Sequence, residues 1–129
     1  MSIKYKLTEK GLPGVVGGGP KKWYATIVYD GEVTIDELVK SIEKFSALSE
    51  ADIRGVIIAL ENVIQDALAS SKIVRLEKLG SLYPALSSQG TPRKEDFVAK
   101  THIKNTKVNY RPGKRISDAL KNAGFQKAE

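Results

Sequence analysis

Cysteine is absent from this chain of 129 residues, and histidine, methionine and tryptophan each occur once. Without cysteine there is no disulfide framework, no thiol nucleophile and no thiolate metal site. Long apolar runs are absent too, since none approaches the roughly 20 residues that a membrane-spanning helix needs. The opening residues, Met-Ser-Ile-Lys-Tyr-Lys, lack the apolar segment of a secretory signal. We therefore expect a cytoplasmic protein that has no membrane partner.

Residues that support catalysis are equally scarce. The one histidine, His102, lies between Lys100 and Lys104 in a strand-like stretch and has no evident acid or nucleophile as a partner. The glycine-rich segment 11–20 matches neither phosphate-loop pattern, G-x-x-x-x-G-K-[ST] or G-x-G-x-x-G, and fits a long hairpin loop better. Acids between positions 34 and 88 are spaced as helix caps and solvated faces, not as a metal cluster. The sequence predicts no enzyme, and no metal, cofactor or small-molecule substrate.

Negative charge is in short supply towards the C-terminus. The formal net charge is +6, and residues 1–33 contribute +2 of it (five Lys/Arg against three acids). Residues 34–88 contribute −2 (six against eight), and residues 89–129 contribute +6 (ten against four). Such asymmetry favours a polyanionic partner, and nucleic acid fits better than a membrane because no basic amphipathic helix stands out. A basic surface that serves only solubility is the alternative.

The N-terminal part of the chain is predicted to form a β-hairpin. Apolar and polar residues alternate over positions 2–7, and positions 22–29 are rich in aromatic and β-branched residues. Three of these aromatic residues, Trp23, Tyr24 and Tyr29, could stack on nucleic-acid bases. Packing against the domain is the favoured role for most of them.

Two helices are predicted after the hairpin. Thr34 and Glu37 fit a capping box, and apolar residues at helical spacing follow as far as Phe45. Ser49 can cap a second helix, which extends to about residue 68. This helix has a wider apolar stripe than one small helix can cover: Val56, Ile57, Leu60, Val63 and Ile64. A symmetric dimer would bury the stripe; in a monomer, the N-terminal hairpin would have to cover it.

Extended segments dominate the rest of the chain. Strands are predicted over 73–76, 81–86 and 101–110, and Pro84 restricts the second of them to an edge or a bulge. The polar segment 87–96 forms either a mobile arm or a short helical turn that begins near Pro92. The last strand leads through Pro112 and Gly113 into a short amphipathic helix.

This strand–turn–helix places three cations, Arg111, Lys114 and Arg115, beside a helix start. The unpaired N–H groups and the dipole of a helix start are themselves positive, so an external phosphate could use both. On these residues alone, a solvated turn whose charges only maintain solubility is an equal alternative.

Two motifs resemble the HU/IHF family of bacterial histone-like DNA-binding proteins. Leu79-Gly-Ser-Leu82 stands where the family has a Gly-Phe-Gly-Thr-Phe-like turn. Tyr110-Arg-Pro-Gly-Lys114 stands where it has Phe-Lys-Pro-Gly-Lys before a closing helix, and residues 33–68 match its helix pair. The resemblance covers residues 33–123. The residues before it look like the extension of a divergent HU-related subgroup found in Bacteroidetes-type bacteria.

The resemblance implies an α+β, IHF-like DNA-binding fold: a two-helix hairpin, a three-stranded antiparallel sheet with an arm, and a C-terminal helix, preceded here by the N-terminal β-hairpin. It implies an extension at 1–32 and a DNA-binding domain at 33–129. It also implies a homodimer whose basic saddle binds double-stranded DNA with little regard to sequence, as a nucleoid-associated protein that condenses DNA in the cytoplasm. The phosphate contacts it implies are Arg75, Lys78, Arg93, Lys94, Lys100, Lys104, Lys107, Arg111, Lys114 and Arg115.

The chain departs from the family at the arm. The family usually has Arg-Asn-Pro there, with a proline that wedges between base pairs. This chain has Thr91-Pro-Arg-Lys94 followed by Glu95 and Asp96, so Pro92 is the candidate wedge beside two acids that would repel the DNA backbone. Leucines replace the two aromatic residues of the turn motif. The alternative function is therefore an HU-fold module for protein–protein interaction or a structural role, which has lost DNA bending.

Overall fold

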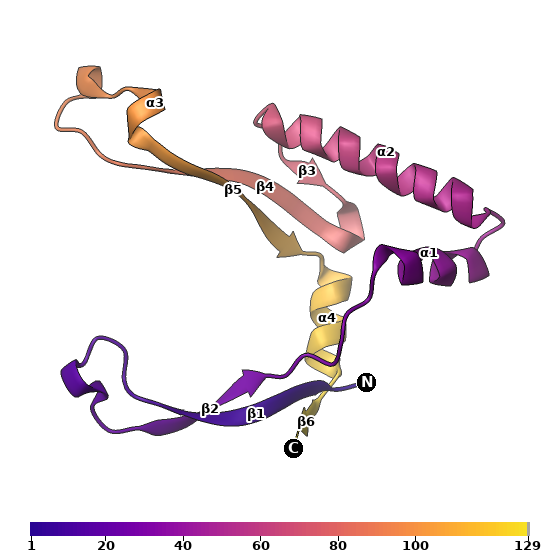
Figure 1. The fold of residues 1–129 in the computed structure, drawn as a ribbon, viewed down its shortest axis with the longest axis horizontal. Coiled ribbons are helices and arrows are strands. Elements are labelled where there is room, and N and C mark those ends of the chain that lie inside the picture. Colours follow the sequence, from indigo (N-terminus) through magenta and orange to yellow (C-terminus); the bar gives the residue numbers. More distant parts are fainter. Residues whose placement is uncertain (129) are drawn as a thin grey trace. The chain divides into compact units, whose positions relative to one another are not determined.

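The computed structural model describes residues 1–128, and the chain divides into two compact units (Figure 1). One unit contains residues 1–37 and the chain from residue 118 onwards, and the other contains residues 38–117. Helices α1 (Ile35–Lys44) and α4 (Lys114–Asn122) each begin in one unit and end in the other. The fold is mixed α+β, with four helices and two three-stranded sheets in the described chain, as the sequence predicts at this level.

The first unit contains a sheet of strand order β2-β1-β6. Strand β1 (Ile3–Lys10) pairs antiparallel with β2 (Lys22–Ile27), which confirms the predicted hairpin and its long glycine-rich loop. Strand β6 (Phe125–Lys127) pairs parallel with the start of β1, where Ile3 is opposite Phe125. The sequence did not predict β6. Three residues are too few to show a period, and the partner of this strand lies at the other end of the chain.

The predicted helix starts are present. The Thr34 hydroxyl accepts a hydrogen bond from the Glu37 amide (3.4 Å), just before α1. Ser49 caps α2 (Glu50–Ala69) in a complete capping box: its hydroxyl accepts from the Asp52 amide (3.2 Å), and the Asp52 carboxylate accepts from the Ser49 amide (3.4 Å). These bonds satisfy N–H groups that the first helical turn leaves without a partner.

The hydrophobic core of the described chain is very small. Val39 and Ile53 are its only buried hydrophobic side chains, at 1% and 3% exposed. Along α2, by contrast, Val56 is 60% exposed and Val63 is 67% exposed. A chain of this length normally buries well over half of the surface that its unfolded form exposes. The folded chain therefore leaves the apolar stripe of α2 open, as its width in the sequence indicated.

The second unit contains an antiparallel sheet of strand order β3-β4-β5, formed by β3 (Val74–Arg75), β4 (Gly80–Ser88) and β5 (Ile103–Pro112). The sheet confirms the three predicted strands. β4 is the middle strand, so the prediction that Pro84 confines its strand to an edge or a bulge is wrong for the strand as a whole. However, β3 pairs only with Ser81 and Leu82, so at Pro84 the strand pairs with β5 alone and is locally an edge. The register shift of the β4–β5 pair lies elsewhere, between Ser87 and Ser88.

Strands β4 and β5 extend beyond β3 as a two-stranded arm, which ends in short helical segments (Figure 1). A 3-10 turn at Lys94–Asp96 confirms the alternative of a short helical turn after Pro92. A one-turn helix, α3 (Ala99–His102), precedes β5, so His102 lies in a helix and not in the predicted strand. There, its Nδ1 accepts from the Val98 amide (2.9 Å) and its ring lies 5.3 Å from that of Phe97. These contacts give His102 a structural role at the end of the arm.

Candidate nucleic-acid interface

The two glycine-containing motifs of the sequence pack against each other. The Gly113 amide donates to the Leu79 carbonyl (3.4 Å), and the Tyr110 hydroxyl donates to the same oxygen. A Cβ on Gly113 would overlap the Lys78 carbonyl, and one on Gly80 would overlap the Arg111 carbonyl. Gly80 also has a φ of +122°, which side-chain-bearing residues rarely adopt. Glycine at both positions therefore allows the end of β5 to lie directly on the turn before β4.

This packing fixes the register of the sheet, and the register separates its residues onto two faces. Residues directly opposite each other in paired strands share a face, and successive residues alternate. The pairs Arg75–Ser81, Ser81–Arg111 and Ala85–Lys107 therefore define one face, and Val74–Leu82, Leu82–Tyr110 and Pro84–Val108 define the other. The first, which we call the polar sheet face, consists of Arg75, Ser81, Tyr83, Ala85, Ser87, Asn105, Lys107, Asn109 and Arg111.

Tyr83 lies at the centre of the basic end of the polar sheet face. The guanidinium of Arg75 lies 5.3 Å from the centre of its ring, and that of Arg111 lies 4.9 Å from it. The Arg75 Nη1 also donates to the Tyr83 hydroxyl (2.7 Å) and to the Ser81 hydroxyl (3.3 Å). Cation–π contacts at exposed sites are worth about 0.5–1 kcal/mol each. The two guanidiniums are thus held in place by an uncharged ring and not by a carboxylate.

Negative charge is missing from the whole of this sheet. Strands β3, β4 and β5 contain no Asp or Glu, but they contain four cations, all exposed: Arg75, Lys104, Lys107 and Arg111. Lys104 lies outside the polar sheet face; around the other three cations, hydroxyl and amide side chains fill most of that face. Cations combined with uncharged hydrogen-bond donors are the groups that contact phosphate and sugar in protein–DNA complexes.

Three further predicted contacts lie at the packed turns. Lys78 is in the 3-10 turn Glu77–Leu79, and Lys114 and Arg115 are the first two residues of α4. All three are exposed, and the close approach of Gly113 to Lys78 brings the two turns together. No acid occurs in the first turn of α4, so the positive end of that helix lies beside these cations.

The arm holds the other predicted residues, and not all of its cations are free. Arg93 forms a two-bonded ion pair with Asp96, with Nε and Nη2 each 3.3 Å from a carboxylate oxygen. The Lys104 ammonium donates to the Thr101 carbonyl (3.0 Å). Pro92, the candidate wedge, is exposed. The polar sheet face therefore brings together Arg75, Lys107 and Arg111, whereas Arg93, Lys94 and Lys100 lie outside it, on the arm beyond its paired strands.

Comparison with known proteins adds family evidence to this geometry. The family model for an HU domain fused to a wHTH, Ig or glycine-rich motif (HU-HIG) matches residues 1–127. The chain belongs to the HU-HIG family. The match confirms the HU resemblance and extends it over the N-terminal hairpin. None of the curated proteins matches the sequence.

A solved structure has a similar fold. A crystal structure from Bacteroides vulgatus ATCC 8482, described as that of a "Putative bacterial DNA binding protein", matches 98% of this chain with a TM-score of 0.66 and 13% sequence identity. The chain spans about half of that protein, 47% of its length. At this identity the likeness supports the fold.

Sequence reasoning missed Tyr83 within this HU domain. Its position two residues after Ser81 places it on the same face as Arg75 and Arg111, but that face is defined only once the register is known. The sequence did offer one signal for this surface: the predicted strands lack acidic residues, and this can be seen before the strand pairing is known.

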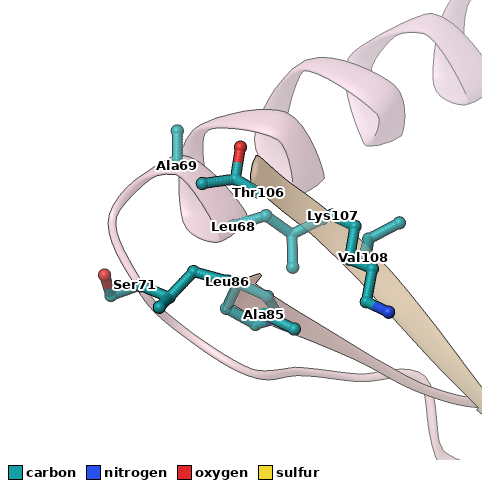
Figure 2. A pocket seen from close by; sticks show the side chains of 9 residues that line it. Leu68, Ala69, Ser71, Ala85, Leu86, Thr106, Lys107 and Val108 are labelled. Atoms are coloured by element: carbon teal, nitrogen blue, oxygen red, sulfur yellow. The ribbon is translucent and has the colours of Figure 1, made fainter. Parts of the chain in front are cut away.

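The opposite face of the HU-domain sheet is apolar and borders a groove beside the end of α2 (Figure 2). Leu68 from α2, Pro84 and Leu86 from β4, and Val108 from β5 line it, together with Ala85 and Lys107 of the polar sheet face. Leu86 is 60% exposed and Val108 is 51% exposed. The sheet thus has one polar, basic face and one apolar face.

Residues 1–128 contain no group of three or more His, Asp or Glu side chains placed to hold a metal ion. None of the described helices is long and apolar enough to span a membrane.

Proposed function

We propose that this HU-HIG chain binds double-stranded DNA without sequence preference, as a non-catalytic, nucleoid-associated architectural protein. The observation that carries the proposal is the acid-free sheet with Arg75, Lys107 and Arg111 on one face. Duplex DNA carries one negative charge per about 1.7 Å of helix axis, so a face with cations and no carboxylate is attracted along its whole length. Contacts to phosphate fix position and orientation, but they carry no sequence information.

The binding unit in this proposal is a homodimer. The exposed stripe of α2 and the apolar groove of Figure 2 leave large hydrophobic side chains uncovered, and Phe45 after α1 is 90% exposed. Contiguous apolar surface of this kind marks a site of association. A second copy of the chain covers such surfaces on both partners at once, because an interface with two-fold symmetry uses the same patch twice.

Binding is tested with 30-base-pair duplexes of unrelated sequence, titrated at several salt concentrations. Replacing three cations of the polar sheet face together (R75A/K107A/R111A) should weaken binding to every duplex alike. It should also reduce the log–log salt slope by about 2.7 for each chain, and so by about 5.4 for the homodimer, because each neutralised phosphate contributes about 0.9. The matched control, K40A/K44A/K72A, removes the same charge from exposed positions outside the sheet and should change the slope little.

One observation favours a second function. The Arg93–Asp96 ion pair and the adjacent Glu95 lower the positive charge of the arm where DNA contact requires it. An HU fold that binds a protein through this arm is the alternative. The wild-type titration separates the two functions, since absence of duplex binding even at low salt would leave only the protein-binding function.

A further inference from the structure

The N-terminal sheet β2-β1-β6 is amphipathic, with a register that separates two different faces. The pairs Tyr5–Ile27, Leu7–Ala25 and Ile3–Phe125 lie on one face, which is apolar. The pairs Lys6–Thr26, Thr8–Tyr24 and Lys10–Lys22 lie on the other. An amphipathic sheet buries its apolar face and leaves the polar face to solvent. In this chain, however, the apolar face is also open, since Ile27 is 51% exposed and Phe125 is 79% exposed. We call the second face the lysine face.

The lysine face combines cations with hydroxyl groups. Lys10 lies opposite Lys22, Thr8 lies opposite Tyr24, and Lys6 lies opposite Thr26. All three lysines are exposed. The Thr26 and Thr8 hydroxyls are hydrogen-bonded to each other across the strands (3.2 Å). Glu9, the one acid in β1 and β2, alternates onto the apolar face opposite Trp23, and Asp30 after β2 is paired with Lys4 (2.7 Å). Lys4 is also on the lysine face, so the Asp30 carboxylate reaches this face at its Lys4 end, where it is already paired. Strands β1 and β2 themselves place no carboxylate beside Lys6, Lys10 and Lys22.

One pair on this face is electrostatically unfavourable in the isolated protein. Lys10 and Lys22 are directly opposite each other in the β1–β2 ladder. Like charges in this position destabilise a strand pair, because their side chains lie about 5 Å apart at Cβ. An anion placed between them would convert the repulsion into two attractions.

We propose that the lysine face is a second phosphate-binding surface of this protein, which contacts the backbone of duplex nucleic acid independently of the polar sheet face. Same-face residues recur about every 7 Å along a strand, so Lys6 and Lys10 form a row along β1 with Lys22 beside it. A linear polyanion matches such a row. The Thr and Tyr hydroxyls supply the uncharged donors that accompany cations in phosphate contacts. This surface lies in a different compact unit from the polar sheet face.

The test is the triple variant K6Q/K10Q/K22Q of the full chain, measured by salt-dependent duplex titration. The expected result is a salt slope reduced by about 2.7 for each chain, or about 5.4 for the homodimer, with equal loss on unrelated sequences. The matched control, K44Q/K72Q/K127Q, removes the same charge; Lys127 lies on the opposite face of the same sheet. The triple variant should fold at least as well as the wild type, because it removes the Lys10–Lys22 repulsion, and thermal unfolding checks this.

The two proposals can fail separately. If R75A/K107A/R111A binds duplexes normally while K6Q/K10Q/K22Q does not, the polar-sheet-face proposal is wrong and the lysine face stands. If K6Q/K10Q/K22Q has the slope of the control variant, the lysine face is not a nucleic-acid surface. A further measurement uses vesicles that contain anionic lipid. Loss of vesicle binding in the triple variant, with unchanged duplex binding, would also overturn the proposal.

Discussion

Tyr83 shows how a single uncharged residue can organise a basic site. Two guanidiniums held close together repel each other, and a carboxylate between them would cancel the positive charge that our proposal assigns to phosphate contact. The ring of Tyr83 instead attracts both Arg75 and Arg111 through its π-face, and its hydroxyl accepts from Arg75. The positive charge is oriented without being neutralised.

Removing the ring should therefore reduce duplex affinity without changing the number of phosphates contacted. We expect Tyr83→Ala to weaken binding about fivefold, equivalent to about 1 kcal/mol, and Tyr83→Phe, which loses only the hydroxyl, about twofold. The salt slope should stay at the wild-type value in both, because no cation is removed. Fluorescence anisotropy with labelled duplexes measures both quantities. Tyr29→Ala, at another exposed tyrosine, is the control, and an effect of Tyr83→Ala no larger than this would contradict the prediction.

At the scale of elements, the contact between the turns that contain Gly80 and Gly113 sets the strand register on which the polar sheet face depends. Gly80 and Gly113 lie far apart in the sequence, yet each occupies a place where the other's turn leaves no room for a Cβ. Because side chains alternate along a strand, a slip of one residue would move Arg111 to the apolar face. In our proposal, the two glycines therefore affect DNA binding through the register of β4 and β5.

Substituting either glycine should destabilise the HU domain. Gly113→Ala and Gly80→Ala force a Cβ into a backbone carbonyl, and Gly80 also has a positive φ. We expect each change to lower the free energy of unfolding by about 3 kcal/mol and the melting temperature by about 10 °C. Thermal unfolding followed by circular dichroism measures this. Gly90→Ala, where nothing lies within 4 Å of an added Cβ, should unfold like the wild type; similar melting temperatures for all three variants would argue against the packing.

At the scale of the whole molecule, the small core has to be completed from outside the chain. Two buried hydrophobic residues among those described are too few to offset the conformational entropy of a chain of this length. The open stripe of α2 supplies the missing apolar surface. Folding and dimerisation are therefore coupled in our proposal, as in obligate dimers whose monomers are unstable.

Charges on the α2 stripe should disrupt the dimer. Light scattering of the wild type should give a mass of about 28 kDa, twice the chain mass of 14.1 kDa. Val56→Asp combined with Val63→Asp places two carboxylates on one helix face and should give a monomer or an unfolded chain, because burying an unpaired charge costs several kcal/mol. Val16→Asp, at a fully exposed valine in the glycine-rich loop, should leave the dimer intact. A wild-type mass of 14.1 kDa at all concentrations would rule out the dimer.

The sequence by itself determined most of the elements and the family. The Ser49 cap, the helical spacing of α1 and α2, the alternation in β1 and the two glycine motifs are local patterns, and local geometry is enough to interpret them. The motif order was sufficient to predict membership of an HU-related family, which the match over residues 1–127 confirmed. The division into 1–32 and 33–129 and the individual phosphate contacts stay predictions.

Only the tertiary structure decided how these elements present their charges. The parallel pairing of β6 with β1, the separation of each sheet into two faces, and the Arg75–Tyr83–Arg111 cluster depend on residues distant in sequence. The Arg93–Asp96 pair is local, but its formation depends on the 3-10 turn that follows Pro92. Composition and spacing give the number of charges. Strand pairing and register decide which charges lie on the same surface and which are already in ion pairs. In this chain, strand pairing and register place one basic surface on the HU-domain sheet and support the proposal of another on the N-terminal hairpin.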